Sequence, residues 1–265
     1  MKLGFIGLGI MGAPMAHHLL KAGHALYTHT RSKTPDELLS DGAQRCANAA
    51  EVAQQADIIF TMLPDTPDVE KVLFGEHGVA SALTKGKIVV DMSSISPIST
   101  KAFASRINAL GCEYLDAPVS GGQVGAKNAT LTIMVGGGAT TFEQVKPLFE
   151  LMGKNITLVG GNGDGQTAKV REALMGGFAA SRILEVHGER MIKRTFDPGF
   201  RIELHQKDLN LALSAARELG LALPHTASAQ QLFASCVAHG GKAWDHSALV
   251  KALENMADFE LTEKP

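Results

Sequence analysis

The chain has 265 residues, which is long enough for two domains of ordinary size. Its formal net charge of −2 gives no overall basic field, so we expect no nucleic acid partner. No run of about 18 apolar residues predicts a membrane span, and no leader pattern precedes the first strand. Cys46, Cys112 and Cys236 are odd in number and far apart. This spacing indicates a reducing compartment without disulfides, and we expect a cytoplasmic protein.

Short apolar runs alternate with helical patterns over the first 160 residues. Strands are predicted at 2–6, 25–30, 56–62, 87–92, 113–116 and 131–135. Helices are predicted between them at 9–23, 35–40, 49–55, 67–74, 97–110 and 141–152. Alternation of this kind favours βαβ units and a mostly parallel sheet.

A different pattern follows the glycine-rich segment 160–165. Residues 170–259 contain no convincing strand, and helical stretches occur at 207–219, 227–238 and 247–257. We therefore expect an α/β Rossmann-type doubly wound parallel sheet at residues 1–162. A smaller all-α domain is expected at residues 163–265.

A glycine-rich loop joins the first expected strand to the first expected helix. Gly7, Gly9 and Gly12 form the pattern G-x-G-x-x-G directly after the strand at 2–6. The first glycine permits a tight turn, the second lets the backbone approach a pyrophosphate, and the third allows close packing of helix on strand. The helix N-terminus offers free N–H groups to the phosphates. The loop predicts a dinucleotide site, the alternative being a glycine-rich turn in another α/β protein.

The end of the second strand bears on the choice of cofactor. An acidic side chain there binds the ribose 2′-hydroxyl of NAD, whereas an arginine accommodates the 2′-phosphate of NADP. The sequence continues with Thr30, Arg31, Ser32 and Lys33 and has no acid. We therefore favour NADP over NAD. The alternative is that Arg31 and Lys33 are solvated loop charges.

Two further segments suit a small carboxylic acid. Ser120, Gly121 and Gly122 follow a strand and a proline, and such a turn exposes N–H groups that bind anions. An ordinary turn is the alternative. Lys169 follows the segment 160–165 between the two expected domains. A desolvated lysine there can act as a general acid, although most single lysines are solvated surface charges.

Three blocks of sequence resemble, in order and spacing, the β-hydroxyacid dehydrogenase family. They are GFIGLGIMGAPMAHHLLKAGH at 4–24, DAPVSGG at 116–122 and GNGDGQTAKV at 161–170. The likeness extends over nearly the whole chain. It implies an oxidoreductase that transfers hydride between NAD(P)H and a short aldehyde-acid, such as tartronate semialdehyde, giving D-glycerate in glyoxylate metabolism.

The resemblance also implies roles for single residues. Lys169 matches the catalytic lysine, which protonates the carbonyl oxygen as hydride reaches the carbon. Ser120, Gly121 and Gly122 match the residues that hold the substrate carboxylate. Ser94 and Lys207 are expected to contact both substrate and cofactor. The other cofactor contacts are expected at Gly7, Leu8, Gly9, Ile10, Met11, Gly12, Thr30, Arg31, Ser32, Leu63 and Pro64.

The sequence departs from the family pattern just after Lys169. The family has an Asn three positions after the lysine and then a long interdomain helix, whereas this chain has Glu172. A segment on the order of thirty residues is missing by that comparison, which as a helix would span about 45 Å. A carboxylate cannot donate the amide hydrogen bond, and Glu172 could pair with Lys169. Either the sequence omits residues of the intact protein, or the deletion is genuine.

Three functions stay open on these grounds. The first is reduction of a short aldehyde-acid, by this substrate or in the manner of a 3-hydroxyisobutyrate dehydrogenase. The second is cofactor binding with impaired catalysis. The third, an imine reductase on the same fold, is disfavoured because those relatives usually carry Asp or Tyr in place of Lys169. We expect a homodimer or homotetramer with a small-molecule substrate and no metal, since the histidines near the N-terminus lack ligand spacing.

Overall fold

The computed structural model of this protein describes residues 1–175 and 181–260, without the side chains of Glu172 and Ala173. Contacts divide the chain into two compact units, Met1–Glu172 and Ala173–Pro265. The division lies beyond the boundary expected after residue 162, because α8 (Asp164–Met175) begins in the N-terminal unit.

The N-terminal unit contains a nine-stranded sheet within its described residues. The strands are β1 (Lys2–Ile6), β2 (Ala25–His29), β3 (Gln44–Arg45), β4 (Ile58–Thr61), β5 (Ile88–Asp91), β6 (Glu113–Asp116), β7 (Val119–Ser120), β8 (Leu131–Gly136) and β9 (Gly153–Gly160). Their order is β3-β2-β1-β4-β5-β6-β8-β7, with β9 beside β8. The first six are parallel, and β8 runs antiparallel to β6 and β7. This order is that of a dinucleotide-binding sheet and confirms the predicted Rossmann-type fold.

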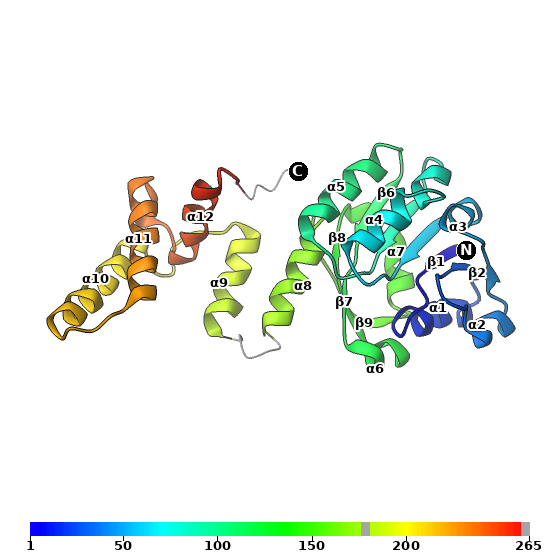
Figure 1. Ribbon diagram of the computed structural model, residues 1–265, viewed down its shortest axis with the longest axis horizontal. Coiled ribbons are helices and arrows are strands. Elements are labelled where there is room, and N and C mark those ends of the chain that lie inside the picture. The colour runs from blue at the N-terminus through cyan, green and yellow to red at the C-terminus, as the bar shows by residue number, and fades with distance from the viewer. Residues whose placement is uncertain (176–180, 261–265) are drawn as a thin grey trace. The chain divides into compact units, whose positions relative to one another are not determined.

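Helices cover both faces of this sheet (Figure 1). One face packs against α1 (Gly12–Lys21), α2 (Asp36–Ser40), α6 (Gly122–Lys127) and α7 (Ala139–Phe149). The other packs against α3 (Ala49–Gln55), α4 (Thr66–Phe74) and α5 (Pro97–Asn108). Successive strand residues alternate between the two cores: Phe5 belongs to the first and Ile6 to the second. Burial on both faces explains why the strands read as continuous apolar runs.

Several elements were not expected from the sequence. Strands β3 and β7 have two residues each, too few for a periodic pattern. The helix α6 begins at Gly122 after another glycine, and glycine is a poor helix former. Strand β9 mixes polar and apolar residues because its side chains are only partly buried.

The described residues of the C-terminal unit form helices joined by loops and contain no named strand, as predicted. The unit consists of α9 (Arg182–Lys193), α10 (Ile202–Glu218), α11 (Pro224–Ala238) and α12 (Val250–Ala257), with two short 3₁₀ turns before α12. Its buried apolar core is small and contains Ile202, Phe233, Cys236, Ala248 and Ala252.

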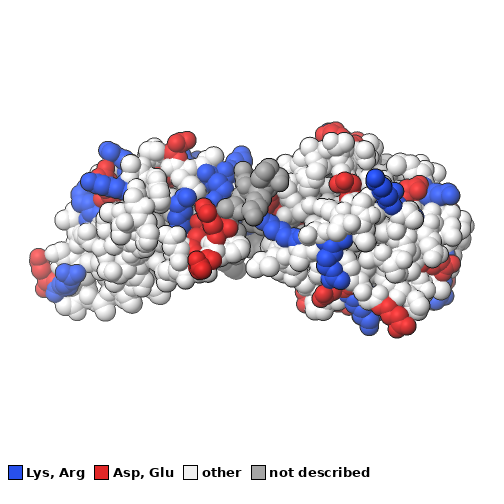
Figure 2. Space-filling model, turned by 90° about the horizontal axis from the view of Figure 1, so that it is seen from above, with Lys and Arg blue, Asp and Glu red and all other residues white. Residues whose placement is uncertain are grey.

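Charged side chains of both signs lie on the surface (Figure 2), and the cysteines are buried. Lys and Arg side chains are interspersed with Asp and Glu over the face seen in Figure 2. All three cysteines are buried and free of disulfides. None of the described helices is long and apolar enough to cross a membrane.

Candidate active site

The glycine loop has the geometry that a pyrophosphate site requires. Gly7 has φ +97°, and its N–H donates to the carbonyl of His29 at 3.0 Å. A Cβ at Gly7 would overlap the Met62 carbonyl, and one at Gly12 would overlap the Gly7 carbonyl. Gly9 differs, because nothing of the protein lies within 4 Å of a Cβ built there. The open space before Gly9 fits a bound pyrophosphate, and the neighbouring Ile10 is 71% exposed.

The loops after β1, β4 and β5 meet at the carboxyl edge of the sheet. Gly7 lies against the Met62 carbonyl after β4. The N–H of Leu63 donates to Oγ of Ser93, after β5, at 2.9 Å. The strand order reverses between β1 and β4, and the crevice outside such a reversal is where open α/β sheets bind ligands. Pro64 and Ser94 are exposed along the same edge.

A buried carboxylate ends β5. Asp91 accepts hydrogen bonds from Oγ1 of Thr61 at 2.8 Å, from the N–H of Ser93 at 3.1 Å and from the hydroxyl of Tyr114 at 3.3 Å. Burial raises the pKa of Asp91, and these hydrogen bonds offset part of that effect. The side chain therefore ties the end of β5 to its neighbours on both sides.

A second buried carboxylate ends β6 and holds the start of α8. Asp116 accepts the N–H of Gly163 at 2.7 Å and that of Gln166 at 3.0 Å. Burial raises the pKa of Asp116 to about 7, against the opposing effect of these two donors. The carboxyl group satisfies N–H groups at the beginning of α8 that have no partner within the helix.

Gln166 connects α8 to the loop after β5. Its Nε2 donates to the carbonyl of Ser93 at 2.7 Å, and its Oε1 accepts the N–H of Ile95 at 3.1 Å. The side chain is 1% exposed. Lys169 lies about one helical turn further along α8 and is half-buried. The sequence predicts site roles for Ser94 and Lys169 but not for Ser93 or Gln166. Ser93 is nevertheless adjacent to Ser94, and Gln166 lies in the same sequence motif as Lys169.

The segment Ser120–Gly122 forms the expected turn. Gly121 and Gly122 have φ of +125° and +58°, a region that favours glycine. The carbonyl of Gly121 accepts the N–H of Gly125 at 2.9 Å as α6 begins. His18 of α1 contacts the Ala126 carbonyl through Nε2 at 2.9 Å, so α6 is fixed to the helix that follows the glycine loop.

The residues after β2 are mostly exposed. Arg31 is 75% exposed, and its guanidinium pairs with Asp68 of α4 at 2.9 Å. The hydroxyls of Thr30 and Ser32 lie 3.3 Å apart. An ion pair this exposed contributes about 0–1 kcal/mol, so Arg31 can turn toward a ligand at little cost.

Lys207 belongs to the C-terminal unit. It is exposed on α10, and its Nζ pairs with Asp208 at 3.1 Å. Its expected contacts with substrate and cofactor stay a prediction. The expected effect of Glu172 on Lys169 also stays a prediction, because the Glu172 side chain lies outside the described residues.

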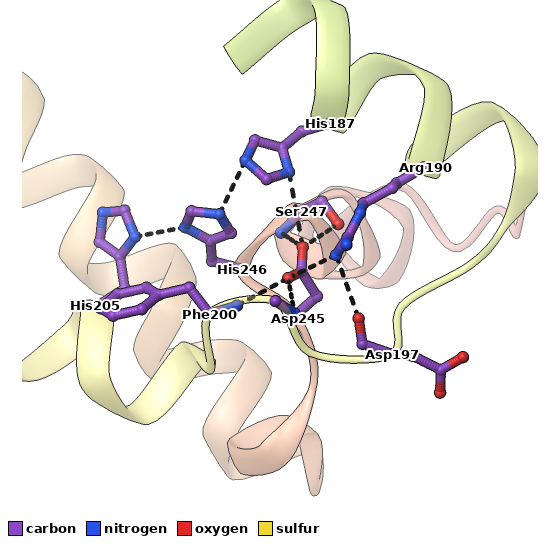
Figure 3. A network of polar contacts seen from close by, with 9 residues as sticks. His187, Arg190, Asp197, Phe200, His205, Asp245, His246 and Ser247 are labelled. Carbon is purple, nitrogen blue, oxygen red and sulfur yellow. Dashed lines mark hydrogen bonds and ion pairs between the residues drawn. The ribbon is translucent and has the colours of Figure 1, made fainter. Parts of the chain in front are cut away.

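A chain of imidazoles crosses the C-terminal unit (Figure 3). Nδ1 of His205 lies 2.8 Å from Nδ1 of His246, whose Nε2 lies 2.9 Å from Nε2 of His187. Nδ1 of His187 lies 3.6 Å from a carboxylate oxygen of Asp245. Burial lowers the pKa of both His205 and His246, which favours the neutral form of these two rings.

Asp245 is the centre of this network and is fully buried. It pairs with Arg190 at 2.7 Å and accepts the N–H groups of Gly199 and Phe200 at 2.8 and 3.1 Å. Burial alone would raise its pKa, but the hydrogen bonds from Ser247, Phe200 and Gly199 hold the pKa well below its usual range. Although His187, Asp245 and His246 lie close enough to hold a metal ion, Arg190 already balances the carboxylate charge. The cluster connects α9, α10 and the turn before α12 through side-chain contacts. The spacing of these residues in the sequence does not predict it.

The glycine loop at the strand reversal, with a lysine-bearing helix on the same sheet edge, defines a nicotinamide-dependent dehydrogenase. The family model "NAD binding domain of 6-phosphogluconate dehydrogenase" matches residues 2–161. The model "NAD-binding of NADP-dependent 3-hydroxyisobutyrate dehydrogenase" matches residues 158–253. The chain belongs to the β-hydroxyacid dehydrogenase family of oxidoreductases, which use a nicotinamide cofactor.

Among its relatives, the 2-hydroxy-3-oxopropionate reductase of Escherichia coli is 60% identical over 98% of this chain and 100% of its own length. A 3-hydroxyisobutyrate dehydrogenase from Mycobacterium tuberculosis, solved with L-serine, is 27% identical with a TM-score of 0.60, over 95% of this chain and 98% of its own. An imine reductase from a Pseudomonas species shares the fold, with 17% identity and a TM-score of 0.55 over 95% and 98% of the two chains.

The length of the first alignment bears on the missing segment. It has 291 positions, which exceeds the 265 residues of this chain by 26. At least that many residues of the reductase therefore have no counterpart here. This number is close to the size of the helix that the family pattern places after Lys169.

Proposed function

We propose that this protein reduces tartronate semialdehyde (2-hydroxy-3-oxopropionate) to D-glycerate, with NADPH as the favoured cofactor. The observation that carries the proposal is the row of hydrogen bonds from Leu63 through Ser93 to Gln166, which joins the glycine-loop edge of the sheet to α8. Lys169 lies on that helix. The 60% identity to a reductase of this name supports the choice of substrate.

Different residues of the chain bind the substrate carboxylate and donate the proton in this reduction. The reduced nicotinamide, when bound, supplies hydride to the aldehyde carbon. The N–H groups of Gly121 and Gly122 and the hydroxyl of Ser120 bind the substrate carboxylate. The ammonium of Lys169 donates a proton to the carbonyl oxygen, so the aldehyde becomes an alcohol, and Lys169 then recovers a proton from water. Ser94 contacts both substrate and cofactor, and the contacts expected of Lys207 stay a prediction.

The preference for NADP rests on the segment after β2. Thr30, Arg31 and Ser32 offer two hydroxyls and a guanidinium to a 2′-phosphate, and Arg31 is held only by an exposed ion pair. The carboxylate of Asp68 must then give up Arg31. One of the matching family models is also described as NADP-dependent.

The test is the loss of absorbance of reduced cofactor on addition of tartronate semialdehyde. We expect turnover with this substrate, faster with NADPH than with NADH at equal concentration. A panel of other short 2-hydroxy and 3-hydroxy acids with oxidised cofactor separates this activity from that of a 3-hydroxyisobutyrate dehydrogenase. Lack of turnover with every member would overturn the proposal.

A second candidate is cofactor binding with impaired catalysis, which the gap in the alignment favours. Without the residues that the reductase has in excess, the chain lacks the family Asn after Lys169. Binding of NADPH with no turnover, unchanged by Lys169→Ala, would support this candidate. The intact mass of the natural protein, compared with the printed sequence, decides whether the missing segment is a genuine deletion.

The setting of the enzyme is also a proposal. We place it in the cytoplasm and in glyoxylate metabolism, because its three cysteines are all free and its proposed product is D-glycerate. Exposed apolar side chains on the C-terminal unit, among them Leu211, Leu253 and Met256, support a homodimer or homotetramer. Light scattering of the purified protein measures the oligomeric state directly.

A further inference from the structure

We propose that Gln166 is a positioning residue whose carboxamide couples the Ser94 loop to the helix that carries Lys169. The proposal rests on the proposed function for the roles of Ser94 and Lys169. Gln166 itself touches neither substrate nor cofactor in this role. It acts by holding two groups that do.

The Gln166 side chain makes two hydrogen bonds to the loop after β5. Its Nε2 donates to the carbonyl of Ser93 at 2.7 Å, and its Oε1 accepts the N–H of Ile95 at 3.1 Å. Both partners are backbone groups, and they flank Ser94 on its two sides. A single carboxamide therefore fixes the main chain around the exposed Ser94 side chain.

Asp116 holds the backbone of Gln166 in place. The backbone N–H of Gln166 donates to Oδ2 of Asp116 at 3.0 Å, and the N–H of Gly163 donates to Oδ1 of the same carboxyl group at 2.7 Å. The first turn of α8 is thereby attached to the end of β6. Because a helix is stiff over one turn, a shift at Gln166 is passed on to Lys169.

Gln166 and its partner Ser93 are both buried. Gln166 is 1% exposed and Ser93 is fully buried. If the Gln166 hydrogen bonds were lost, water could not replace them, and the unpaired backbone groups of Ser93 and Ile95 would destabilise the fold. A side chain that only filled space here would not need both an amide donor and an amide acceptor. Among the described titratable groups, Asp116 of β6 accepts the Gln166 N–H, and Asp91 of β5 accepts the N–H of Ser93. Asp164 and Lys169 lie on the same helix as Gln166.

The experiment compares Gln166→Glu and Gln166→Met in the full chain. The Met variant keeps the volume and loses both hydrogen bonds. The Glu variant keeps the acceptor for Ile95, and it regains a donor to Ser93 only when its carboxyl group is protonated. Burial favours that neutral form. Gln55→Glu and Gln55→Met are matched controls, because Gln55 is exposed at the end of α3.

Three readouts are expected to separate positioning from simple packing. The kcat of the Met variant falls at least about tenfold, while its Kd for NADPH, from fluorescence titration, stays within about twofold. The kcat of the Glu variant relative to the Met variant rises as the pH is lowered from 9 to 6. Hydrogen exchange at the Ile95 amide accelerates in the Met variant and stays slow in the Glu variant and the controls.

The outcomes are distinguishable from those of the proposed function. A native chain that turns over no substrate refutes the proposed function, whereas hydrogen exchange at Ile95 still tests the coupling by Gln166. A Met variant that keeps kcat within twofold of the native enzyme would overturn the positioning role. Unchanged protection of Ile95 in that variant, or identical pH profiles of the Glu and Met variants, would do the same.

Discussion

Asp91 and Asp116 are register partners at the carboxyl ends of β5 and β6, and both side chains are fully buried. Two carboxyl groups so placed resist ionisation together, and each lies in a different set of donors. The Asp91 carboxylate accepts hydrogen bonds from residues of the sheet and of the loop after β5. The Asp116 carboxyl group accepts hydrogen bonds from backbone N–H groups at the start of α8. The pair therefore connects the stability of the fold to the attachment of the lysine-bearing helix.

Asp116 gives the fold a pH dependence of a definite sign. Its pKa is about 7 in the folded chain, against 3.8 ordinarily, so the folded state binds more protons between these values. The stabilising contribution is present below pH 4 and is lost as the pH rises to 7. It amounts to on the order of 4 kcal/mol for a shift of this size.

The variant Asp116→Asn isolates this effect. It loses one acceptor for Gly163 or Gln166, which costs about 1–3 kcal/mol. Urea unfolding of native and variant protein is compared from pH 4 to pH 8. We expect the stability difference between the two to depend on pH over 4–7. A difference that is constant over this range would show that Asp116 is already ionised at pH 4.

Gly9 and Gly12 separate binding from folding. Gly12→Ala forces a Cβ into the Gly7 carbonyl and is expected to lower the thermal midpoint by several degrees. Gly9→Ala meets no protein atom within 4 Å and leaves the midpoint within about a degree. Its effect falls on NADPH binding, which we expect to weaken at least tenfold in a fluorescence titration. Equal NADPH affinity in Gly9→Ala and native protein would argue against the pyrophosphate site.

Arg31 is expected to set the choice of nicotinamide cofactor. Arg31→Ala removes the guanidinium offered to a 2′-phosphate and lowers kcat/KM for NADPH about tenfold or more, with little change for NADH. Asp68→Ala is the matched variant, because it frees Arg31 from its ion pair. It leaves the preference for NADPH unchanged or increases it. If Arg31→Ala lowers kcat/KM equally for NADPH and NADH, then Arg31 does not contact the 2′-phosphate.

Lys169→Met tests the proton donor. We expect kcat to fall about 10²- to 10⁴-fold, the range for loss of a general acid, with the Kd for NADPH unchanged. Lys154→Met, at an exposed position on β9, serves as the control and keeps native kcat. A Lys169→Met variant that retains native turnover would exclude this lysine as the acid.

Asp245 gives the C-terminal unit the opposite pH dependence. Its depressed pKa means that its stabilising contribution is present above about pH 4 and is lost as the pH falls further. Asp245→Asn leaves Arg190 without its counter-charge and is expected to cost about 2–3 kcal/mol, a reduced value because Arg190 is 31% exposed. Circular dichroism during acid titration measures the effect. An acid midpoint that is the same in both proteins would contradict it.

Features encoded over short stretches were predictable from the sequence. The glycine loop, the parallel strands β1, β2, β4, β5 and β6 and the helical C-terminal unit all follow from local patterns. The connection of Gln166 to Ser93 does not, because the two residues are 73 positions apart and meet only through the fold. The pairing of Arg31 with Asp68 and the imidazole chain depend on tertiary contacts in the same way. Site residues inside motifs could therefore be named, and the residues that hold them could not.

The small core of the C-terminal unit determines which part of the protein a protease attacks first. Among the described residues, five buried apolar side chains form that core, whereas two extensive clusters hold the N-terminal unit. A protease added at moderate urea concentration would therefore degrade the helical unit first. The surviving fragment would retain the whole glycine loop and still bind to an immobilised nucleotide, long after reduction of the substrate had ceased.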